Sequence, residues 1–290
     1  NQQFVGRPIR IAIDAGNGMG GHTAPAVMSK INAVVDGIYF DLDGTFPNHE
    51  ANPIDAKNLV DLQKLVRDKE ADIGLAFDGD ADRCFLVDER GELVSPSALT
   101  ALIAERELKK SPGSSIIFNL ICSRAVPEVI KENGGVALRS RVGHSFIKKM
   151  MAENDATFGG EHSGHFYFKD FWNADSGMLA ALHAIAALFD EQKPLSELMD
   201  RFNRYSLSGE INTKVEDPKA AIAQIKAEFS KLSEKVEFDE LDGLTVSSAN
   251  WSFNVRPSNT EPLLRLNVEA VNIDERLLVQ DLVLRLLRSR

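Results

Sequence analysis

Three aspartates at alternate positions form the part of the sequence best suited to chemistry. Asp78, Asp80 and Asp82 directly follow an apolar segment, residues 73–77, which the pattern predicts to be a buried strand. Carboxylates held this close raise one another's pKa values unless a cation neutralises them, and oxygen ligands favour Mg²⁺ or Ca²⁺. The spacing therefore predicts a divalent-metal site. Arg83 comes next in the chain, where its side chain could hold an anion beside the ion.

Two other structures fit part of this segment. Clusters of Asp and Gly often form plain turns at strand ends, and that interpretation stays open. An EF-hand loop would start at Asp78 and end at Glu89. Its sixth position, which needs glycine for a sharp bend, is Arg83, and the flanking segments indicate strands rather than helices. The EF-hand is therefore disfavoured.

Two further polar segments could bind a ligand, one through its hydroxyls and the other through a phosphate. The glycine-rich segment 157–165 offers donors and acceptors suited to vicinal hydroxyls, although a surface turn fits it equally well. The segment 256–262 and the nearby Arg265 combine two arginines with hydroxyl and amide groups around a turn bounded by prolines. Arginine forks and short polar donors suit the oxygens of a phosphate, so this segment predicts a phosphate cradle.

Two motifs point to other chemistry. Gly16, Gly18 and Gly21 match the dinucleotide fingerprint G-x-G-x-x-G, but the acidic residue expected about 20 residues later lacks its usual context, so we interpret the glycines as structural. Asp41 and Asp43 resemble the D-x-D-G-T nucleophile motif of haloacid-dehalogenase-type phosphatases, with Asp41 as phosphoryl acceptor. A complete strand–helix unit precedes that motif, and prolines follow it. The phosphatase is therefore the alternative function.

Composition limits the class of protein. With 290 residues, 43% of them hydrophobic and 26% charged, the chain is long enough for two or three globular cores. No segment approaches the ~18 uninterrupted apolar residues of a membrane span, and the first residues have no signal-peptide character. Cys84 and Cys122 each lie in an apolar strand, which favours reduced thiols and a cytoplasmic protein. The net charge of -10 argues against a general nucleic-acid binder.

The order of the expected elements predicts the fold class. Short apolar strands alternate with amphipathic helices over residues 1–95 and again over 96–205, whereas residues 206–290 contain several strands between two helices. We therefore expect an α/β protein with two consecutive three-layer strand–helix domains, each built on a mainly parallel mixed sheet. A smaller α+β domain with an antiparallel sheet should follow. The polar join at 203–208 is predicted to be a hinge.

Four motifs together resemble the α-D-phosphohexomutase superfamily, in particular its bacterial phosphomannomutase/phosphoglucomutase branch. They occur in the family's order across the whole chain: Asp78-Gly-Asp-Ala-Asp-Arg83, Val142-Gly-His-Ser145, Gly160-Glu-His-Ser-Gly-His165 and Arg256-Pro-Ser-Asn-Thr260. The resemblance implies a four-domain isomerase, with domain two at 1–95 bearing the metal loop, domain three at 96–205 the sugar loop and domain four at 206–290 the phosphate loop. It also implies a first domain with a phosphoserine loop of the type T-x-S-H-N-P, which these 290 residues do not contain.

The resemblance implies a reversible phosphoryl transfer between the 6- and 1-positions of a hexose phosphate, mannose or glucose. A phosphoserine donates, a 1,6-bisphosphate forms and turns around, and the serine takes the other phosphate back. One Mg²⁺ ion and glucose or mannose 1,6-bisphosphate are the implied cofactors. The implied partners are hexose phosphates and the first domain, with no nucleic acid or membrane, and the enzyme is expected to be a monomer. Without the phosphoserine the chain alone should be inactive.

Residue roles follow from the same resemblance. The implied metal ligands are Asp78, Asp80 and Asp82, the implied catalytic residues are Arg83 and His144, and the implied substrate-binding residues are Glu161, Ser163, His165, Arg256, Ser258, Asn259, Thr260 and Arg265. One position departs from the family pattern, because Ile121 stands where better-known relatives have a lysine before Cys122-Ser-Arg124. The departure leaves the preference between mannose and glucose phosphates open.

Overall fold

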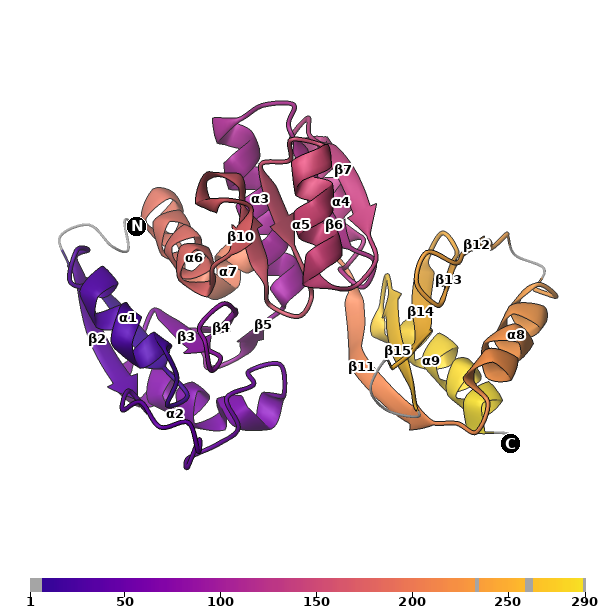
Figure 1. Cartoon of the computed structure of the whole chain (residues 1–290), viewed down its shortest axis with the longest axis horizontal. Coiled ribbons are helices and arrows are strands. Elements are labelled where there is room, and N and C mark those ends of the chain that lie inside the picture. The colour runs from indigo at the N-terminus through magenta and orange to yellow at the C-terminus, as the bar shows by residue number, and fades with distance from the viewer. Residues whose placement is uncertain (1–6, 233–234, 259–262, 289–290) are drawn as a thin grey trace. The chain divides into compact units, whose positions relative to one another are not determined.

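The computed structural model describes residues 7–232, 235–258 and 263–288 (Figure 1). The chain divides into two compact units. Unit 1 consists of Asn1–Arg139 and Gly143–Asn203, and unit 2 of Ser140–Val142 and Arg204–Arg290. Among the helices of the described residues, none combines the length and the apolar character needed to cross a lipid bilayer.

Unit 1 begins with a five-stranded mixed sheet in the order β2-β1-β3-β4-β5. Its strands are β1 (Ile9–Asp14), β2 (Ala33–Ile38), β3 (Ile73–Phe77), β4 (Cys84–Asp88) and β5 (Leu93–Val94). β1 pairs in parallel with β2 and β3, whereas β3–β4 and β4–β5 are antiparallel. Every residue of the central strand β3 is buried, as its uninterrupted apolar sequence predicts. The buried strand therefore holds the next residue, Asp78, at a fixed position at its carboxyl end.

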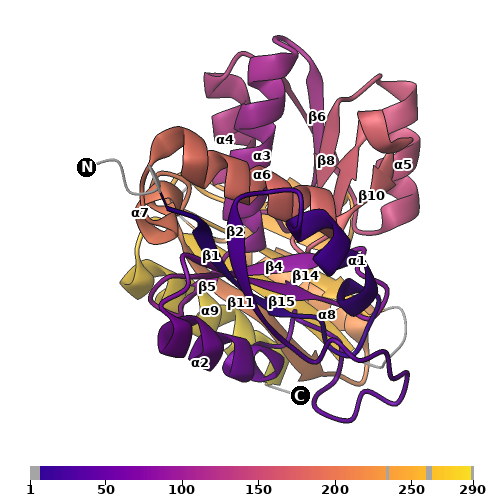
Figure 2. The same ribbon diagram turned by 90° about the vertical axis from the view of Figure 1, so that its left-hand side faces the viewer.

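Helices cover both faces of this sheet (Figure 2). α1 (Gly20–Met28) packs through Ala24 and Met28 onto Ile11 and Ile13 of β1. On the other face, the short helix η1 (Ala56–Leu59) and α2 (Val60–Lys69) form a second cluster with strands β1, β3 and β4. Since the two faces bury different side chains of the same strands, the unit has the three layers expected from its sequence.

A second five-stranded sheet follows in unit 1, in the order β10-β9-β8-β6-β7. Its strands are β6 (Ser115–Asn119), β7 (Val136–Ser140), β8 (Phe158–Gly160), β9 (Phe166–Phe168) and β10 (Ala174–Asp175). The accompanying helices are α3 (Pro96–Lys110), α4 (Ala125–Glu132), α5 (His144–Glu153), η2 (Lys169–Phe171), α6 (Gly177–Glu191) and α7 (Leu195–Asp200). β6 and β8 are parallel, whereas β8–β9 and β9–β10 are antiparallel.

The two sheets of unit 1 share one hydrophobic core. The core cluster contains Leu75 of β3 from the first sheet, Phe166 of β9 from the second, and Ala184 of α6. α6 contacts β3 and β4 as well as β9, so a single helix packs against both sheets. The proposed division of unit 1 at residue 95 therefore runs through a continuous core, and the domain limits inferred from sequence stay a prediction.

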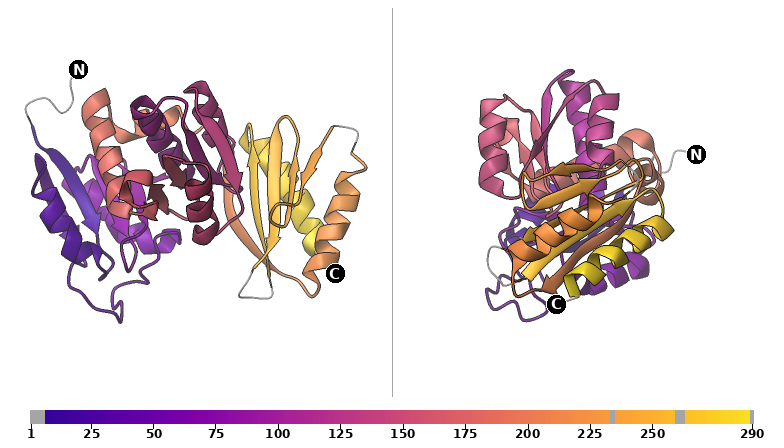
Figure 3. Two further views of the ribbon diagram at one scale, coloured as in Figure 1. Left: turned by 45° about the horizontal axis from the view of Figure 1, so that its top comes forward. Right: turned by 90° about the vertical axis from the view of Figure 1, so that its right-hand side faces the viewer.

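Unit 2 contains a five-stranded sheet in the order β11-β15-β14-β13-β12, and all of its pairings are antiparallel. Its elements are β11 (Ser206–Lys214), α8 (Pro218–Phe229), β12 (Glu237–Asp239), β13 (Leu244–Ser247), β14 (Trp251–Pro257), β15 (Leu263–Ala270) and α9 (Ile273–Arg288). Both helices lie on one face of the sheet (Figure 3). On that face Phe229 packs edge-on against Trp251 and Phe253.

The fold class predicted from the sequence is confirmed: two mixed sheets layered with helices precede an antiparallel α+β unit. Cys84 and Cys122 are free and buried, as expected. The predicted hinge at 203–208 is wrong in extent, because Ser206 already begins β11 and pairs with Ala270 of β15. Alternating polar residues hid this strand, since one of its faces carries side chains such as Glu210 and Asn212.

Truncating a fully buried side chain of α8 tests the core of unit 2. Ile225→Ala should lower the free energy of unfolding by roughly 2–5 kcal/mol, because Ile225 is fully buried and a cavity would remain. Urea denaturation followed by the fluorescence of the buried Trp251 measures this loss. Leu278→Ala on α9 is the control, since Leu278 is 71% exposed and should change stability by less than about 0.5 kcal/mol. Equal losses in the two variants would contradict the assigned core.

Candidate functional site

The three aspartates lie together at the end of β3. Asp78, Asp80 and Asp82 each place one carboxylate oxygen within 4.8 Å of the others. Asp78 is buried, Asp82 is partly buried and Asp80 is exposed, so the cluster opens to solvent on one side. The chain can curl so tightly because Ala81 takes a left-handed φ of 63°. The predicted carboxylate cluster therefore forms, with oxygens spaced closely enough to coordinate one cation.

The charge balance of the cluster suits a divalent cation. Burial, followed by the carboxylates of Asp78 and Asp80, raises the pKa of Asp82 to about 7. Asp82 Oδ1 is also buried without a hydrogen-bond partner among the described residues. A buried oxygen without a donor is unfavourable unless a cation satisfies it. These residues fit Mg²⁺ because all their ligand atoms are hard oxygens and the open side leaves room for water.

Arg83 is fixed beside the aspartates. Its Nε donates to Asp78 Oδ2 at 2.7 Å, and one terminal nitrogen donates to Asn52 Oδ1 at 3.0 Å. The backbone N–H of Arg83 also donates to Asp78 Oδ1 at 3.1 Å. A guanidinium carries five N–H donors, so three remain for an anion. The side chain is 22% exposed and can meet a ligand from solvent.

The loop between β8 and β9 carries Glu161, Ser163 and His165. It closes tightly, because Glu161 N donates to His165 O at 3.0 Å and Gly164 N donates to Glu161 O at 3.1 Å. Gly164 has a φ of 89°, and a Cβ there would lie 2.3 Å from the ring of Phe85, so only glycine fits. Cys84 N donates to Gly164 O at 3.2 Å, and Arg83 and His165 form an isolated antiparallel bridge. A backbone bond therefore joins the loop to the end of the metal cluster.

Glu161 is almost fully enclosed. It is 2% exposed, and its carboxylate accepts from Tyr167 Oη at 2.6 Å, Asn119 Nδ2 at 3.1 Å and Gly143 N at 3.3 Å. A carboxylate has about four lone-pair sites, so one remains for a further donor. Its contacts hold the loop to β6, β9 and the start of α5. The binding of sugar hydroxyls by Glu161 stays a prediction, and only the one remaining lone-pair site of its carboxylate could accept from a hydroxyl.

His165 connects the two loops through its side chain. Its Nδ1 lies 2.9 Å from Ser163 Oγ, and its Nε2 lies 3.6 Å from Asp82 Oδ1. Burial lowers the pKa of His165, so the ring is neutral near pH 7. Asp175 of β10 completes a group with Asp82 and His165 whose ligand atoms all lie within 4.8 Å of one another, while Lys148 pairs with Asp175 at 2.8 Å. The structure thus brings Ser163 and His165 next to the aspartate cluster.

The two remaining predicted positions of unit 1 lie at helix starts or turns. His144 is the first residue of α5, and its side chain is exposed. Within the described part of the chain it makes no hydrogen bond or ion pair. Ile121 lies in the turn between β6 and α4 and is partly buried. Ile121 stands where better-known relatives have a lysine, and its apolar side chain offers no donor to a phosphate.

The predicted phosphate segment of unit 2 differs from its expected form. Arg256 is only 4% exposed, and its guanidinium donates to Glu210 Oε2 at 2.7 Å, Asn267 Oδ1 at 2.9 Å and Asn254 Oδ1 at 3.3 Å. Burial lowers the pKa of Arg256, and Glu210 opposes that shift. The sequence suggested a guanidinium free for a ligand. In the structure, three of its five donors already serve the strands around it.

Arg265 lies across the hairpin from Arg256, as a paired residue of β15. It donates to Ser258 Oγ at 3.3 Å, while its Nε lies 3.6 Å from Glu210 Oε1. Its side chain is 34% exposed, so it is the more accessible of the two arginines. Asn259 and Thr260, the other predicted phosphate ligands, lie outside the described residues.

The motifs that indicated other chemistry have structural explanations. Gly18 and Gly21 have no room for a Cβ, which would lie 2.5 Å from Gly79 O and 2.1 Å from Phe40 O respectively, so the structural interpretation of the glycines is confirmed. In the phosphatase-like segment, Asp43 Oδ1 accepts from the backbone and hydroxyl of Thr45 at 2.9 and 2.7 Å. Such bonds are typical of an Asx turn, and the segment is exposed, which does not favour a phosphatase nucleophile.

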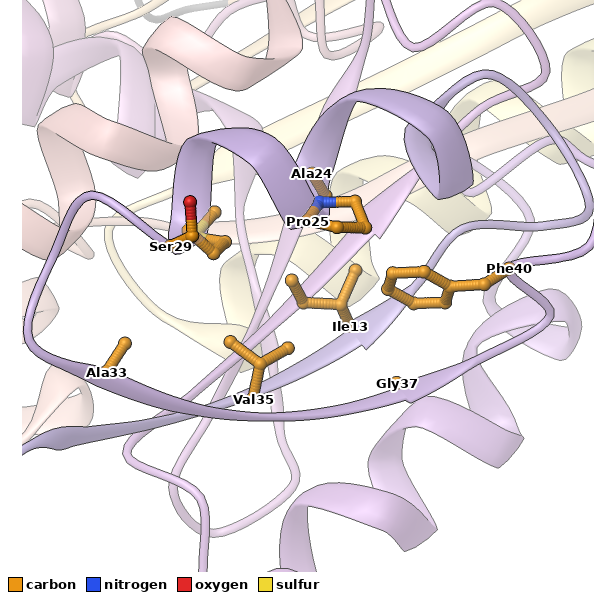
Figure 4. A pocket seen from close by; sticks show the side chains of 9 residues that line it. Ile13, Ala24, Pro25, Ser29, Ala33, Val35, Gly37 and Phe40 are labelled. Carbon is orange, nitrogen blue, oxygen red and sulfur yellow. The ribbon is translucent and has the colours of Figure 1, made fainter.

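An apolar cavity of about 440 Å³ lies between α1 and β2 (Figure 4). Ile13, Pro25, Val35 and Phe40 are among the side chains that line it, and none of the predicted site residues does. It carries Ser29 as a polar side chain but no titratable group. Its lining therefore offers no phosphoryl chemistry, and we place the candidate site at the aspartate cluster.

Sequence reasoning missed several residues that hold the site in place. Asn52, Asn119 and Tyr167 contact predicted site residues. In unit 2, Glu210 contacts both Arg256 and Arg265. Asn119 could have been found, because a polar residue at the end of an apolar strand often faces a ligand edge in α/β sheets. Asn52 lies in a loop 31 residues before Arg83, and no local pattern predicts that contact.

Comparison with known proteins matches three family models to the chain. They are phosphoglucomutase/phosphomannomutase, alpha/beta/alpha domain II, over residues 2–91, alpha/beta/alpha domain III over 95–205, and the C-terminal domain over 210–284. A phosphomannomutase from Methanocaldococcus jannaschii is 43% identical over 264 residues, which cover 90% of this chain and 57% of the relative. The chain spans 57–59% of the length of three curated phosphomannomutases that it matches.

Solved structures of other proteins share the fold of this chain. A phosphoglucomutase/phosphomannomutase family protein from Burkholderia thailandensis superposes with a TM-score of 0.88 at 31% identity, covering 98% of this chain and 61% of that one. Aspergillus fumigatus N-acetylphosphoglucosamine mutase, solved with GlcNAc-6P and magnesium, has a TM-score of 0.69 at 15% identity, covering 98% and 66%. The second likeness shows a shared fold.

Metal affinity should depend on pH. Because the pKa of Asp82 is raised to about 7, a proton competes with the cation below that pH. Calorimetric titration with Mg²⁺ should therefore give an affinity about tenfold lower at pH 6 than at pH 8. Asp82→Asn should weaken binding at both pH values and abolish the difference, whereas Asp155→Asn, at an exposed turn, should change neither. An affinity independent of pH in the unsubstituted chain would contradict the raised pKa of Asp82, and an unchanged affinity in Asp82→Asn would exclude Asp82 as a ligand.

Arg256 should matter for stability. Arg256→Ala would leave the Glu210 carboxylate and two asparagine oxygens without their donor, at a cost of about 1–3 kcal/mol in the free energy of unfolding. Urea denaturation followed by Trp251 fluorescence reports on this unit. Lys231→Ala, which removes an exposed pair with Glu228, is the matched control and should cost under about 1 kcal/mol. If the two losses are equal, the Glu210 contact does not anchor Arg256.

Proposed function

The chain belongs to the phosphoglucomutase/phosphomannomutase family, and we propose that it takes part in the reversible conversion of hexose 6-phosphate into hexose 1-phosphate. Mannose and glucose phosphates are the proposed substrates. The observation that carries this proposal is the aspartate cluster with Arg83, tied by a backbone bond to the loop of Ser163 and His165. That arrangement supports the proposal of a cation site, an anion donor and hydroxyl partners in one region of unit 1.

A bound Mg²⁺ would be held by Asp78, Asp80 and Asp82 and would offset negative charge on a transferring phosphoryl group. Arg83 has three N–H donors left for the oxygens of that group, and its two protein contacts fix its orientation before the ligand arrives. The magnesium of the related N-acetylphosphoglucosamine mutase supports the choice of ion.

The phosphoryl group would pass from a donor oxygen to a sugar hydroxyl, which must lose its proton as the new P–O bond forms. We assign that proton transfer to His144, whose exposed imidazole can meet substrate. Ser163 and His165 would orient the hydroxyls, with Glu161 behind them. In unit 2, Arg265 and Ser258 are the accessible donors for the non-reacting phosphate, with Asn259 and Thr260 beside them in sequence.

The phosphoryl donor is proposed to be a phosphoserine outside these 290 residues, which contain no T-x-S-H-N-P segment. A 1,6-bisphosphate would then be both intermediate and activator. Transfer to and from the serine leaves the enzyme unchanged after each cycle, so the overall reaction is an isomerisation. The chain alone, supplied with Mg²⁺ and glucose 1,6-bisphosphate, should show no sustained turnover.

Two substitutions separate the mutase from the phosphatase alternative. In a version of the protein that includes the phosphoserine donor, Asp80→Ala should lower kcat for mannose 1-phosphate by at least about a hundredfold, because a cation ligand is lost. Asp41→Ala should leave turnover unchanged, since the Asp41 side chain is exposed in a turn segment. A coupled assay for hexose 6-phosphate measures both. Loss of turnover in Asp41→Ala with retention in Asp80→Ala would establish the phosphatase class instead.

A further inference from the structure

The loop between β2 and η1, residues 39–55, is bound to the turn after β1. Asn17 forms most of this attachment. Its backbone N–H donates to Tyr39 O at 2.8 Å, and its side chain donates to Asp41 O at 2.9 Å. Asp43 N donates to Asn17 O at 3.0 Å, and Asn48 Nδ2 donates to Asn17 Oδ1 at 2.8 Å. The loop is thus held to the sheet although its first part is exposed.

The far end of the same loop holds Arg83. Asn52 Oδ1 accepts from a terminal nitrogen of Arg83 at 3.0 Å. The backbone of Asn52 is fixed on both sides, because its N–H donates to Glu50 O at 2.7 Å and its carbonyl accepts from Asn58 Nδ2 at 2.9 Å. Asn58 is 4% exposed, which makes it a rigid support. The guanidinium is therefore clamped between this loop and Asp78.

A buried pair fastens the loop between these two attachments. Asp14, the last residue of β1, is 1% exposed, and its Oδ2 lies 2.9 Å from Nε2 of His49. Asp14 Oδ1 accepts from Gly16 N at 2.8 Å. His49 Nδ1 lies 2.9 Å from Glu50 O, the same carbonyl that accepts from Asn52 N. One oxygen therefore connects the histidine ring with the residue that holds Arg83.

These distances require a shared proton. A carbonyl oxygen can only accept, so Nδ1 of His49 must carry a proton to bond Glu50 O. The contact between His49 Nε2 and Asp14 Oδ2 then needs a second proton, whichever of the two atoms carries it. If that proton is lost, a ring lone pair and a carboxylate oxygen face each other at 2.9 Å, which is repulsive.

The groups around His49 favour the protonated state. Burial disfavours the imidazolium, but the Glu50 carbonyl and the Asp14 carboxylate outweigh it, and the pKa of His49 is raised. Asp61 of α2 acts in the same direction. Tyr39 packs edge-on against the ring and donates to Asp61 at 2.8 Å, and its own pKa is raised to about 12, so it stays neutral. A raised His49 pKa means that the contact is present below the ordinary histidine pKa of about 6.5 and is lost as pH rises through the raised pKa.

We propose that Asp14 and His49 form a proton-dependent latch that sets the orientation of the Arg83 guanidinium through Glu50 and Asn52. Asp14, His49 and Asn52 are then positioning residues for the phosphoryl-transfer site. Their importance for turnover rests on the proposed function of Arg83, but the coupling between His49 and Arg83 does not. Above the pKa of His49 the loop loses its attachment to Asp14, and the hold of Asn52 on Arg83 weakens.

Nuclear magnetic resonance of the 290-residue chain can follow the two ends of the latch separately. Asp82 lies 3.9 Å from Arg83 Nε and its own pKa is raised to about 7, so every variant is measured in an Asp82→Asn background. There the Nε–H signal of Arg83, assigned by its loss in Arg83→Lys, should shift between pH 6 and 9 with the same midpoint as the ring signals of His49. In Asn52→Ala, His49 should still titrate while the Arg83 signal no longer follows it. An Arg83 signal that ignores the His49 midpoint, or still follows it in Asn52→Ala, would overturn the latch.

Two more variants sharpen this experiment. Asp14→Asn keeps the hydrogen bond to Gly16 and lets the amide donate to a neutral His49 ring, so the contact should persist above the His49 pKa and the loss of the Arg83 contact at high pH should disappear. His22→Ala is the matched control, because His22 is an exposed histidine of α1, and both titration curves should be unchanged. A changed Arg83 curve in His22→Ala would assign the titration to the wrong histidine.

Kinetics distinguish failure of the latch from failure of the proposed function. In a version of the protein that includes the phosphoserine donor, kcat should fall above the His49 midpoint with KM unchanged, and Asp14→Asn should remove that fall. If Arg83→Lys leaves turnover intact while the resonance coupling is present, the proposed role of Arg83 fails and the latch stands. If Arg83→Lys loses turnover while the coupling is absent, the latch fails alone.

Discussion

Repulsion among the carboxylates of Asp78, Asp80 and Asp82 is the constraint on which the rest of unit 1 depends. Three such groups within 4.8 Å of one another are unfavourable by themselves, and burial together with this repulsion raises the pKa of Asp82. The fold holds the loop in place against this repulsion. Asp78 directly follows the fully buried β3, and Arg83 Nε donates a hydrogen bond to Asp78. Because the carboxylates stay apart, the site remains open for a cation and for a negatively charged ligand, as electrostatic preorganisation requires.

Much of this site could be predicted because it is local in sequence. An apolar strand ending in alternating aspartates and an arginine determines both the position and the chemistry of the cluster. The glycines of the loop 157–165 likewise predict a tight turn, and Gly164 shows the reason in its contact with Phe85. The alternation of strands and helices was sufficient for the fold class.

The contacts that could not be predicted join residues far apart in the chain. Asn52 and Arg83 are separated by 31 positions, and Glu161 and Asn119 by 42. Glu210 was hidden inside a strand whose alternating polar residues resemble a linker. Hydrogen-bonding capacity can be read from residue type, but the partner that satisfies it depends on tertiary packing. For that reason Arg265 is the more accessible of the two predicted phosphate-binding arginines, while the motif residue Arg256 is engaged by Glu210.

Helix α6 packs against both sheets of unit 1, and its first residue, Gly177, allows no Cβ because Arg83 O would be 2.5 Å away. The aspartate loop and the loop of Ser163 and His165 are consequently joined to one core. Under the proposed function, an intermediate with a phosphate at each end would have to reverse its direction against this shared surface. One fixed set of donors must then recognise the sugar ring in two opposite orientations, so the pseudo-symmetry of the ligand, rather than movement of these two loops, would let both ends react at the same metal.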